Sequence, residues 1–122
     1  MAKNKILIVE DEESLLRLES ILLTSKGYEV IGARNGQQAL EALSNHGPDL
    51  VLLDIMLPEI DGFEVCNRIK NNPETRQIPV IMVTAKNSGD DMARGEAAGA
   101  DWYITKPFKS AMVIETIQRF LP

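Results

Sequence analysis

Short runs of apolar residues recur along the chain, and the strongest of them end in acidic residues. The run at 50–53 has no polar alternation and leads directly into Asp54, and the run at 6–9 leads into Glu10 in the same way. Unbroken apolar runs of this length are typical of strands buried on both faces, as in a parallel sheet. The pattern predicts strands at 5–9, 28–33, 50–54, 78–83 and 101–105.

Between these runs the apolar residues take helical spacing. Asn35 with Gln38, and Asp61 with Glu64, have the capping-box pattern of a helix start, and Gly27 is a typical helix end. The expected helices cover 14–26, the segment from Asn35 to Gly47, the segment from Asp61 to Ile69, 88–98 and about 109–121. In the first of these helices the stripe expected to face the core is Leu15, Leu18, Ile21 and Leu22.

Strands that alternate with helices of about ten residues predict an α/β fold, in which helices cover both faces of one parallel sheet. The length of 122 residues suits a single domain spanning 1–122. The helix at 88–98 is expected to be weakly anchored, because Gly95 lies inside it and its alanines bury little surface. Hydrophobic periodicity does not reveal the order of the strands in the sheet.

Composition narrows the function classes. Apolar residues make up 44% and charged residues 25% of the chain, which is an ordinary globular mixture. The net charge of −5 argues against a nucleic-acid surface, which needs clustered basic residues. Cys66 is the single cysteine, so an internal disulfide framework and a cysteine-type zinc site are excluded. No apolar run approaches the about 20 residues of a membrane span, and the start does not read as a signal peptide, so we expect a cytoplasmic location.

The polar residues that follow the strands are the candidate chemistry. Glu10 and Asp11 follow the first strand, Asp54 ends the third, Thr84 ends the fourth and Lys106 ends the fifth. Parallel strands bring their carboxyl ends to one edge of the sheet, where ligands of open α/β sheets bind. Three close carboxylates favour a hard cation, typically Mg²⁺, and a lysine and a hydroxyl suit the oxygens of a phosphoryl group. Asp54 is then the candidate nucleophile that forms an acyl phosphate.

In this order over five strands, the set Glu10-Asp11, Asp54, Thr84-Ala85 and Lys106-Pro107-Phe108 resembles the receiver domain of two-component response regulators of the chemotaxis-regulator type. Further matches, at Met56-Leu57-Pro58 with Asp61-Gly62 and at Ala98-Gly99-Ala100-Asp101 before Tyr103, extend the resemblance over essentially the whole chain. The resemblance implies the flavodoxin-like strand order 2-1-3-4-5, which would place Glu10, Asp11 and Asp54 side by side.

The resemblance also implies a role for each matching residue. Asp54 would accept a phosphoryl group from a sensor histidine kinase or a phosphotransfer protein. Asp11, Asp54, the backbone carbonyl of Met56 and, through water, Glu10 would hold Mg²⁺, although many members have Asp where this chain has Glu10. Thr84 and Lys106 would hold the phosphoryl oxygens, the Lys106-Pro107 bond would be cis, and Tyr103 would be an aromatic switch that turns inward when Thr84 moves.

The same resemblance bears on output and signal lifetime. The acidic balance favours protein contact over nucleic-acid binding, either with a separate target, with an effector domain of the same protein, or in a phosphorylation-dependent homodimer. In this family, residues two places after the acceptor and two after the threonine flank the approach of water. Here these are Met56 and Lys86, and neither carries a carboxylate or amide that could orient the water, so we expect slow dephosphorylation.

Two other function classes share part of this residue pattern. An aspartyl phosphatase or phosphotransferase also places Asp at a strand end, but it usually has a second acid where this chain has Met56. A flavin carrier shares the strand order, but it needs a phosphate-binding loop where this chain has Glu10-Asp11-Glu12-Glu13. Taken singly, Thr84 could reflect β-propensity and Tyr103 ordinary packing, and the interpretation as a phosphoryl-accepting switch that is not a turnover enzyme depends on the ordered set.

Overall fold

The computed structural model describes residues 4–85, 89–106 and 109–121, with the backbone alone at residues 85, 89–92 and 106. Five parallel strands form one sheet in the order β2-β1-β3-β4-β5. The strands are β1 (Lys5–Val9), β2 (Glu29–Ala33), β3 (Leu50–Asp54), β4 (Val80–Ala85) and β5 (Trp102–Lys106). The parallel α/β fold and the flavodoxin-like order are therefore confirmed.

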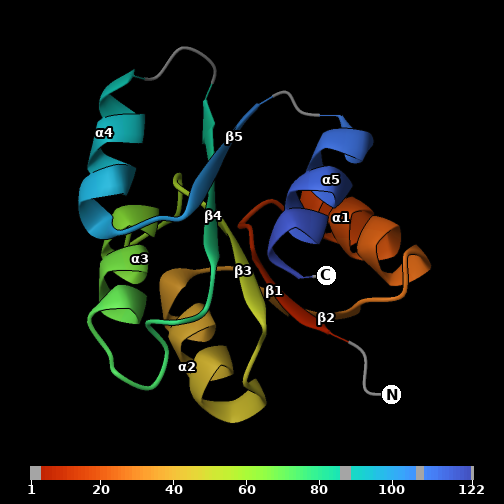
Figure 1. Ribbon diagram of the computed structural model, residues 1–122, viewed down its shortest axis with the longest axis horizontal. Coiled ribbons are helices and arrows are strands. Elements are labelled where there is room, and N and C mark those ends of the chain that lie inside the picture. Colours follow the sequence, from red (N-terminus) through yellow and green to blue (C-terminus); the bar gives the residue numbers. More distant parts are fainter. Residues whose placement is uncertain (1–3, 86–88, 107–108, 122) are drawn as a thin grey trace.

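Five helices connect the strands and cover the sheet on both faces. They are α1 (Glu13–Ser25), α2 (Gly36–His46), α3 (Gly62–Lys70), α4 (Gly89–Ala98) and α5 (Ser110–Phe120). Helices α1 and α5 lie on one face, and α2, α3 and α4 lie on the other (Figure 1). Each face has its own hydrophobic cluster, and the two clusters use alternate residues of the central strands, such as Leu52 and Leu53 of β3. No described helix is long and apolar enough to cross a bilayer.

Most helix boundaries follow the local signals in the sequence. Asn35 and Asp61 are the N-caps of α2 and α3, and their side chains accept hydrogen bonds from the N–H groups of Gln38 and Glu64. The Gln38 side chain reaches back one residue further than the capping box predicts, because it accepts a hydrogen bond from the N–H of Arg34 at 2.8 Å. Satisfied N-terminal N–H groups set where both helices begin.

The predicted buried stripe of α1 is wrong. Leu18 and Ile21 are 63% and 61% exposed, whereas Leu23 is fully buried and Leu16 packs against the core beside it. Glu19 lies between them and is only 7% exposed. The predicted stripe is the more apolar of the two, but packing on the sheet buries the one that contains this carboxylate.

One strand start also differs from the expectation. The fourth strand begins at Val80 and not at Ile78, since the N–H of Ile78 donates to the carbonyl of Thr75 in the preceding turn. Pro79 has no N–H to donate to a ladder. The carboxyl end of the strand, which positions the site, includes Thr84 as predicted.

Candidate functional site

Three carboxylates meet at the carboxyl edge of the sheet. Val9 of β1 pairs with Leu53 of β3, so the next residues, Glu10 and Asp54, lie at the same level on neighbouring strands. One carboxylate oxygen each from Glu10, Asp11 and Asp54 lies within 4.8 Å of the other two. Glu10 and Asp54 are each 3% exposed, and Asp11 is exposed. The predicted acidic cluster is therefore present, with a buried floor and one open side.

The loop after β3 holds Asp54 in place. The N–H of Met56 donates to Asp54 Oδ1 at 2.8 Å, which orients the carboxylate. The carbonyl of Ile55 accepts hydrogen bonds from the N–H groups of Leu57 and Gly62, at 3.0 and 3.1 Å. A Cβ atom at Gly62 would lie 2.5 Å from the Asp54 carbonyl oxygen. Glycine is thus required at 62, because the start of α3 presses against the backbone of the candidate nucleophile.

Hydrogen bonds to the backbone position Glu10 and Asp11, and one of them comes from Arg34, which the sequence did not mark as a site residue. Glu10 Oε2 accepts a hydrogen bond from the N–H of Glu12 at 3.2 Å. Arg34, just after β2, donates from Nη2 to the carbonyl oxygen of Asp11 at 3.1 Å and lies 3.9 Å from the Glu13 carboxylate. No motif marks Arg34, and the pairing of β2 with β1 places it there.

The structure brings the predicted hydroxyl to the same edge. Thr84 of β4 is 1% exposed and lies one position beyond Val83, the residue paired with Asp54. Lys106 ends β5 opposite Ala85, so its backbone also reaches this edge. The Lys106 side chain, all of Lys86 and the expected cis bond to residue 107 lie outside the described residues.

A cleft of about 590 Å³ opens above the acids. The three carboxylates line it together with Met56, whose side chain is 73% exposed at the rim. Another hollow of about 630 Å³ lies between the ends of α2 and α3, and its lining includes none of the three acids. Chemistry therefore favours the first cleft, since carboxylate oxygens at this spacing are the ligands that a hard cation such as Mg²⁺ prefers.

Comparison with known proteins decides the family. Residues 6–118 match the response regulator receiver domain family. This chain belongs to that family. It is 44% identical to the polar-differentiation response regulator DivK of Brucella anthropi over 95% of this chain and 94% of DivK. It is 41% identical to the transcriptional regulatory protein PhoP of Bacillus subtilis, over 96% of this chain but only 48% of PhoP.

A solved structure supports the same assignment. The receiver domain of a sensor histidine kinase from Pseudomonas aeruginosa superposes with a TM-score of 0.89, at 32% identity and with 98% of each chain covered. That crystal structure holds a magnesium ion in its active-site cleft. Receiver domains are in general signalling switches of two-component systems.

In this receiver domain the predicted switch residue lies away from the cleft. The Tyr103 ring packs under α4, and a Cβ atom at Gly95 would lie 2.8 Å from its Cε1. The Tyr103 hydroxyl oxygen is buried and has no hydrogen-bond partner among the described residues. Burial, and after it the charges of Glu96 and Cys66, raises the pKa of Tyr103. Gly95, expected only to weaken α4, makes room for this ring.

Two side chains that sequence reasoning missed form a wall of the cleft. Arg94 of α4 lies over the ring of Phe63 of α3, with its guanidinium carbon 4.1 Å from the ring centroid. Its Nη2 is 3.9 Å from Asp61 Oδ2. Nothing in the sequence indicates that Phe63 and Arg94 together line the receiver cleft. Only the packing of α4 against α3 brings the two together.

Proposed function

We propose that this receiver domain accepts a phosphoryl group on Asp54 from a sensor histidine kinase or a phosphotransfer protein, in a reaction that requires Mg²⁺. The observation that carries the proposal is the cluster of Glu10, Asp11 and Asp54, whose oxygens lie within 4.8 Å of one another at a cleft floor. Membership of the family supports the same reading. A magnesium ion in the cleft of the Pseudomonas aeruginosa relative supports the choice of cation.

Each residue then has a defined task. Asp11, Asp54 and the backbone carbonyl of Met56 would hold the ion directly and Glu10 would hold it through water, and the ion would neutralise charge on the phosphoryl oxygens. Thr84 and Lys106 hold the remaining phosphoryl oxygens. An Asp54 oxygen attacks phosphorus while the bond from phosphorus to the histidine nitrogen breaks, and the electron pair stays with the imidazole. The Met56 hydrogen bond keeps the Asp54 carboxylate oriented before attack.

The output is a change in the surface formed by α4, β5 and α5. Thr84 precedes the connection to α4, and Tyr103 lies under that helix against Gly95. New contacts from Thr84 and Lys106 to the phosphoryl group would shift the equilibrium between two conformations of this surface. Tyr103 would be repositioned in the favoured conformation. The partner that binds this surface is a protein: a separate target, an effector domain or a second copy of the chain. PhoP is about twice as long as the region that matches this chain, so that relative contains a further region beside its receiver domain.

The test is phosphorylation by acetyl phosphate, with the adduct mapped by mass spectrometry. We expect one phosphoryl group on Asp54 in the presence of Mg²⁺ and none after chelation. Asp54→Ala should take up none. Asp49→Ala is the matched control, because Asp49 precedes the same strand at its other end, where Oδ2 accepts the N–H of Lys5 at 2.7 Å. An adduct that persists in Asp54→Ala, or that is insensitive to chelation, would refute the proposal.

Amide exchange with a stable phosphoryl mimic tests the output. Exchange should change across residues 84–108, a range that includes α4 and β5. Changes confined to residues 54–58 would leave phosphorylation intact but contradict the proposed output surface. Salt-dependent binding of DNA by this chain at micromolar affinity would contradict a protein recipient.

A further inference from the structure

The receiver cleft has an uneven charge distribution. Among the described residues that line it, one side chain is basic, Arg94, and five are acidic: Glu10, Asp11, Glu12, Asp54 and Asp61. Three of the acids form the metal cluster on the floor. The Arg94 side chain is 60% exposed, whereas Asp54 is 3% exposed. Arg94 is therefore the solvent-exposed basic side chain of the described cleft lining, whereas the candidate nucleophile is buried.

Arg94 is held in a way that leaves it able to bind an anion. Its guanidinium lies over Phe63, which is itself 8% exposed and so forms a fixed platform. The N–H groups of a guanidinium point outward in its own plane, so stacking on a ring does not consume them. Its ion pair with Asp61 is long, at 3.9 Å, and both side chains are at least half exposed. Such a pair is weak and is readily exchanged for a ligand's carboxylate.

Phosphoryl transfer is in line, so the leaving group departs from the side of phosphorus opposite Asp54. Asp54 is buried at the base of the cleft, so the leaving group points toward the cleft opening, and Arg94 is the exposed basic side chain of the described lining. We propose that Arg94 contacts the leaving group of small phosphoryl donors and makes this receiver domain favour, among such donors, those that leave as carboxylates. This inference rests on the proposed function and adds a donor-selecting residue to it.

Two small donors, acetyl phosphate and phosphoramidate, transfer the same phosphoryl group but differ in the charge of the leaving group. With acetyl phosphate, Asp54 attacks phosphorus, the bond from phosphorus to the acetate oxygen breaks, and the electron pair leaves on acetate. With phosphoramidate, the bond from phosphorus to nitrogen breaks, and the electron pair leaves on a nitrogen that already carries its protons, so neutral ammonia departs. Arg94 stabilises the negative charge that develops on acetate and has no such charge to stabilise on ammonia.

The experiment measures phosphorylation rate constants of the wild type and Arg94→Gln with both donors at saturating Mg²⁺. Salt is held at about 0.5 M so that long-range attraction of the dianion is screened. We expect Arg94→Gln to react about tenfold more slowly with acetyl phosphate and within about twofold of wild type with phosphoramidate, the size expected for one charge-assisted contact. The phosphoramidate rate also reports that the variant is folded.

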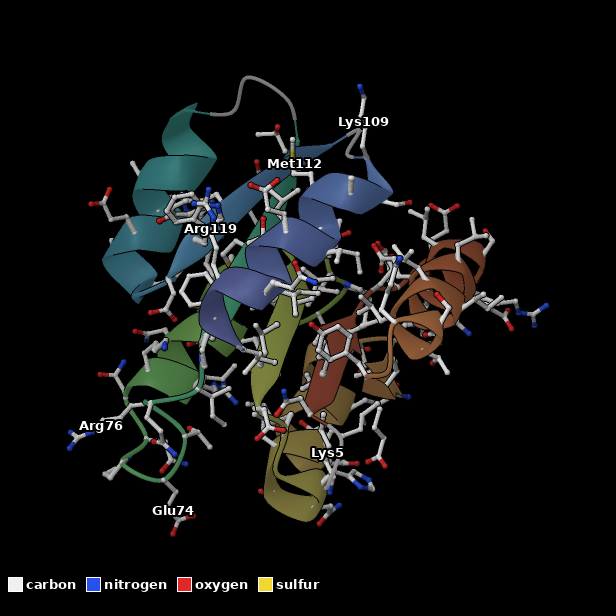
Figure 2. The ribbon with its side chains drawn as sticks, turned by 45° about the vertical axis from the view of Figure 1, so that its right-hand side comes forward. Lys5, Glu74, Arg76, Lys109, Met112 and Arg119 are labelled. Carbon is white, nitrogen blue, oxygen red and sulfur yellow. The ribbon has the colours of Figure 1, made fainter. Side chains whose placement is uncertain are left out.

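Arg119→Gln is the matched control. Arg119 is likewise half exposed, lies over an aromatic ring (Trp102, 5.2 Å) and pairs with an acid (Glu115, 3.8 Å). It projects from α5 (Figure 2) and is not among the described residues that line the cleft. The Arg119→Gln substitution should leave the phosphorylation rate constants with both donors unchanged. Equal losses with the two donors in Arg94→Gln, or no loss with either, would overturn the role of Arg94 and leave the proposed function standing. If neither donor phosphorylates the wild type, the proposed function fails and this inference with it.

Discussion

At the scale of single residues, burial changes the chemistry of Cys66. The side chain is fully buried in α3, and its Sγ donates to the carbonyl of Ala98 at 3.6 Å. Burial, which outweighs the nearby Lys70 ammonium and is reinforced by Asp101, raises the pKa of the Cys66 thiol from 9.0 to about 11. The thiol is therefore a small packed group in the folded protein and a poor nucleophile at neutral pH.

This shift predicts a pH dependence of stability. Above pH 9 the unfolded chain releases the Cys66 proton while the folded chain keeps it, so the thiol's contribution is complete below pH 9 and is lost as pH rises toward 11. We expect the free energy of unfolding of wild type minus that of Cys66→Ala to fall by roughly 2 kcal/mol between pH 8 and 11. Urea denaturation of both proteins measures it, and a constant difference would show that burial does not control this thiol.

A second residue-scale prediction concerns Tyr103. Its hydroxyl oxygen is buried without a hydrogen-bond partner in the described part of the chain. Removing a buried polar group that has no partner is neutral or stabilising. Tyr103→Phe should therefore raise the free energy of unfolding by up to about 1 kcal/mol, as measured by urea denaturation at neutral pH. A loss of more than about 1 kcal/mol would show that the hydroxyl does have a partner in the folded protein.

At the scale of elements, α1 shows how a helix chooses its buried face. The stripe against the sheet contains Leu16, Glu19 and Leu23, and the outer face keeps Leu18 and Ile21 largely exposed. Helical periodicity alone ranks the outer stripe higher, because it contains no charge. The direction in which the chain enters α1 from β1, and the return to β2 at Glu29, set the rotation of the helix.

Matched truncations on α1 test this assignment. Leu23→Ala removes a fully buried side chain, and we expect it to lower the free energy of unfolding by about 3 kcal/mol. Leu18→Ala removes the same atoms from a side chain that is 63% exposed, and its cost should stay below about 1 kcal/mol. Thermal or urea unfolding of the two variants gives the comparison. Equal losses would mean that the outer face of α1 is covered in solution.

At the scale of the whole molecule, the sheet topology concentrates charge at one edge. Glu10 and Asp11 follow β1 and Asp54 ends β3, and their carboxylates repel one another within 4.8 Å. The order β2-β1-β3 makes β1 and β3 neighbours and so creates this repulsion. This repulsion lowers stability at the site proposed to bind a cation, and its size can be measured.

Asp11→Asn should therefore raise the free energy of unfolding in the presence of a chelator, by roughly 1 kcal/mol at low salt. Added Mg²⁺ should stabilise the wild type, because a ligand that binds only the folded state shifts the unfolding equilibrium. The variant, with one ligand lost, should gain less. Thermal unfolding with and without Mg²⁺ checks both statements, and an equal gain in the two proteins would remove Asp11 from the cation site.

Much of this architecture could be predicted from local patterns. Apolar runs such as 50–53 place the strands, Asn35 and Asp61 place two helix starts, and the parallel arrangement brings Glu10, Asp54 and Thr84 to one edge. These features depend on backbone hydrogen bonding and on solvent exclusion within a few residues, which the local sequence controls. The strand order came from the family resemblance and not from periodicity.

Tertiary packing alone decided the remainder. The rotation of α1 depends on the whole sheet, and the place of Arg34 beside Asp11 depends on the pairing of β2 with β1. Arg94 reaches the cleft because α4 packs on α3 over Phe63, and Tyr103 lies under α4 because Gly95 leaves space for its ring. Such contacts join residues that are eight or more positions apart. Their free energies arise from shape and charge complementarity between elements, which no local pattern of apolar and polar residues records.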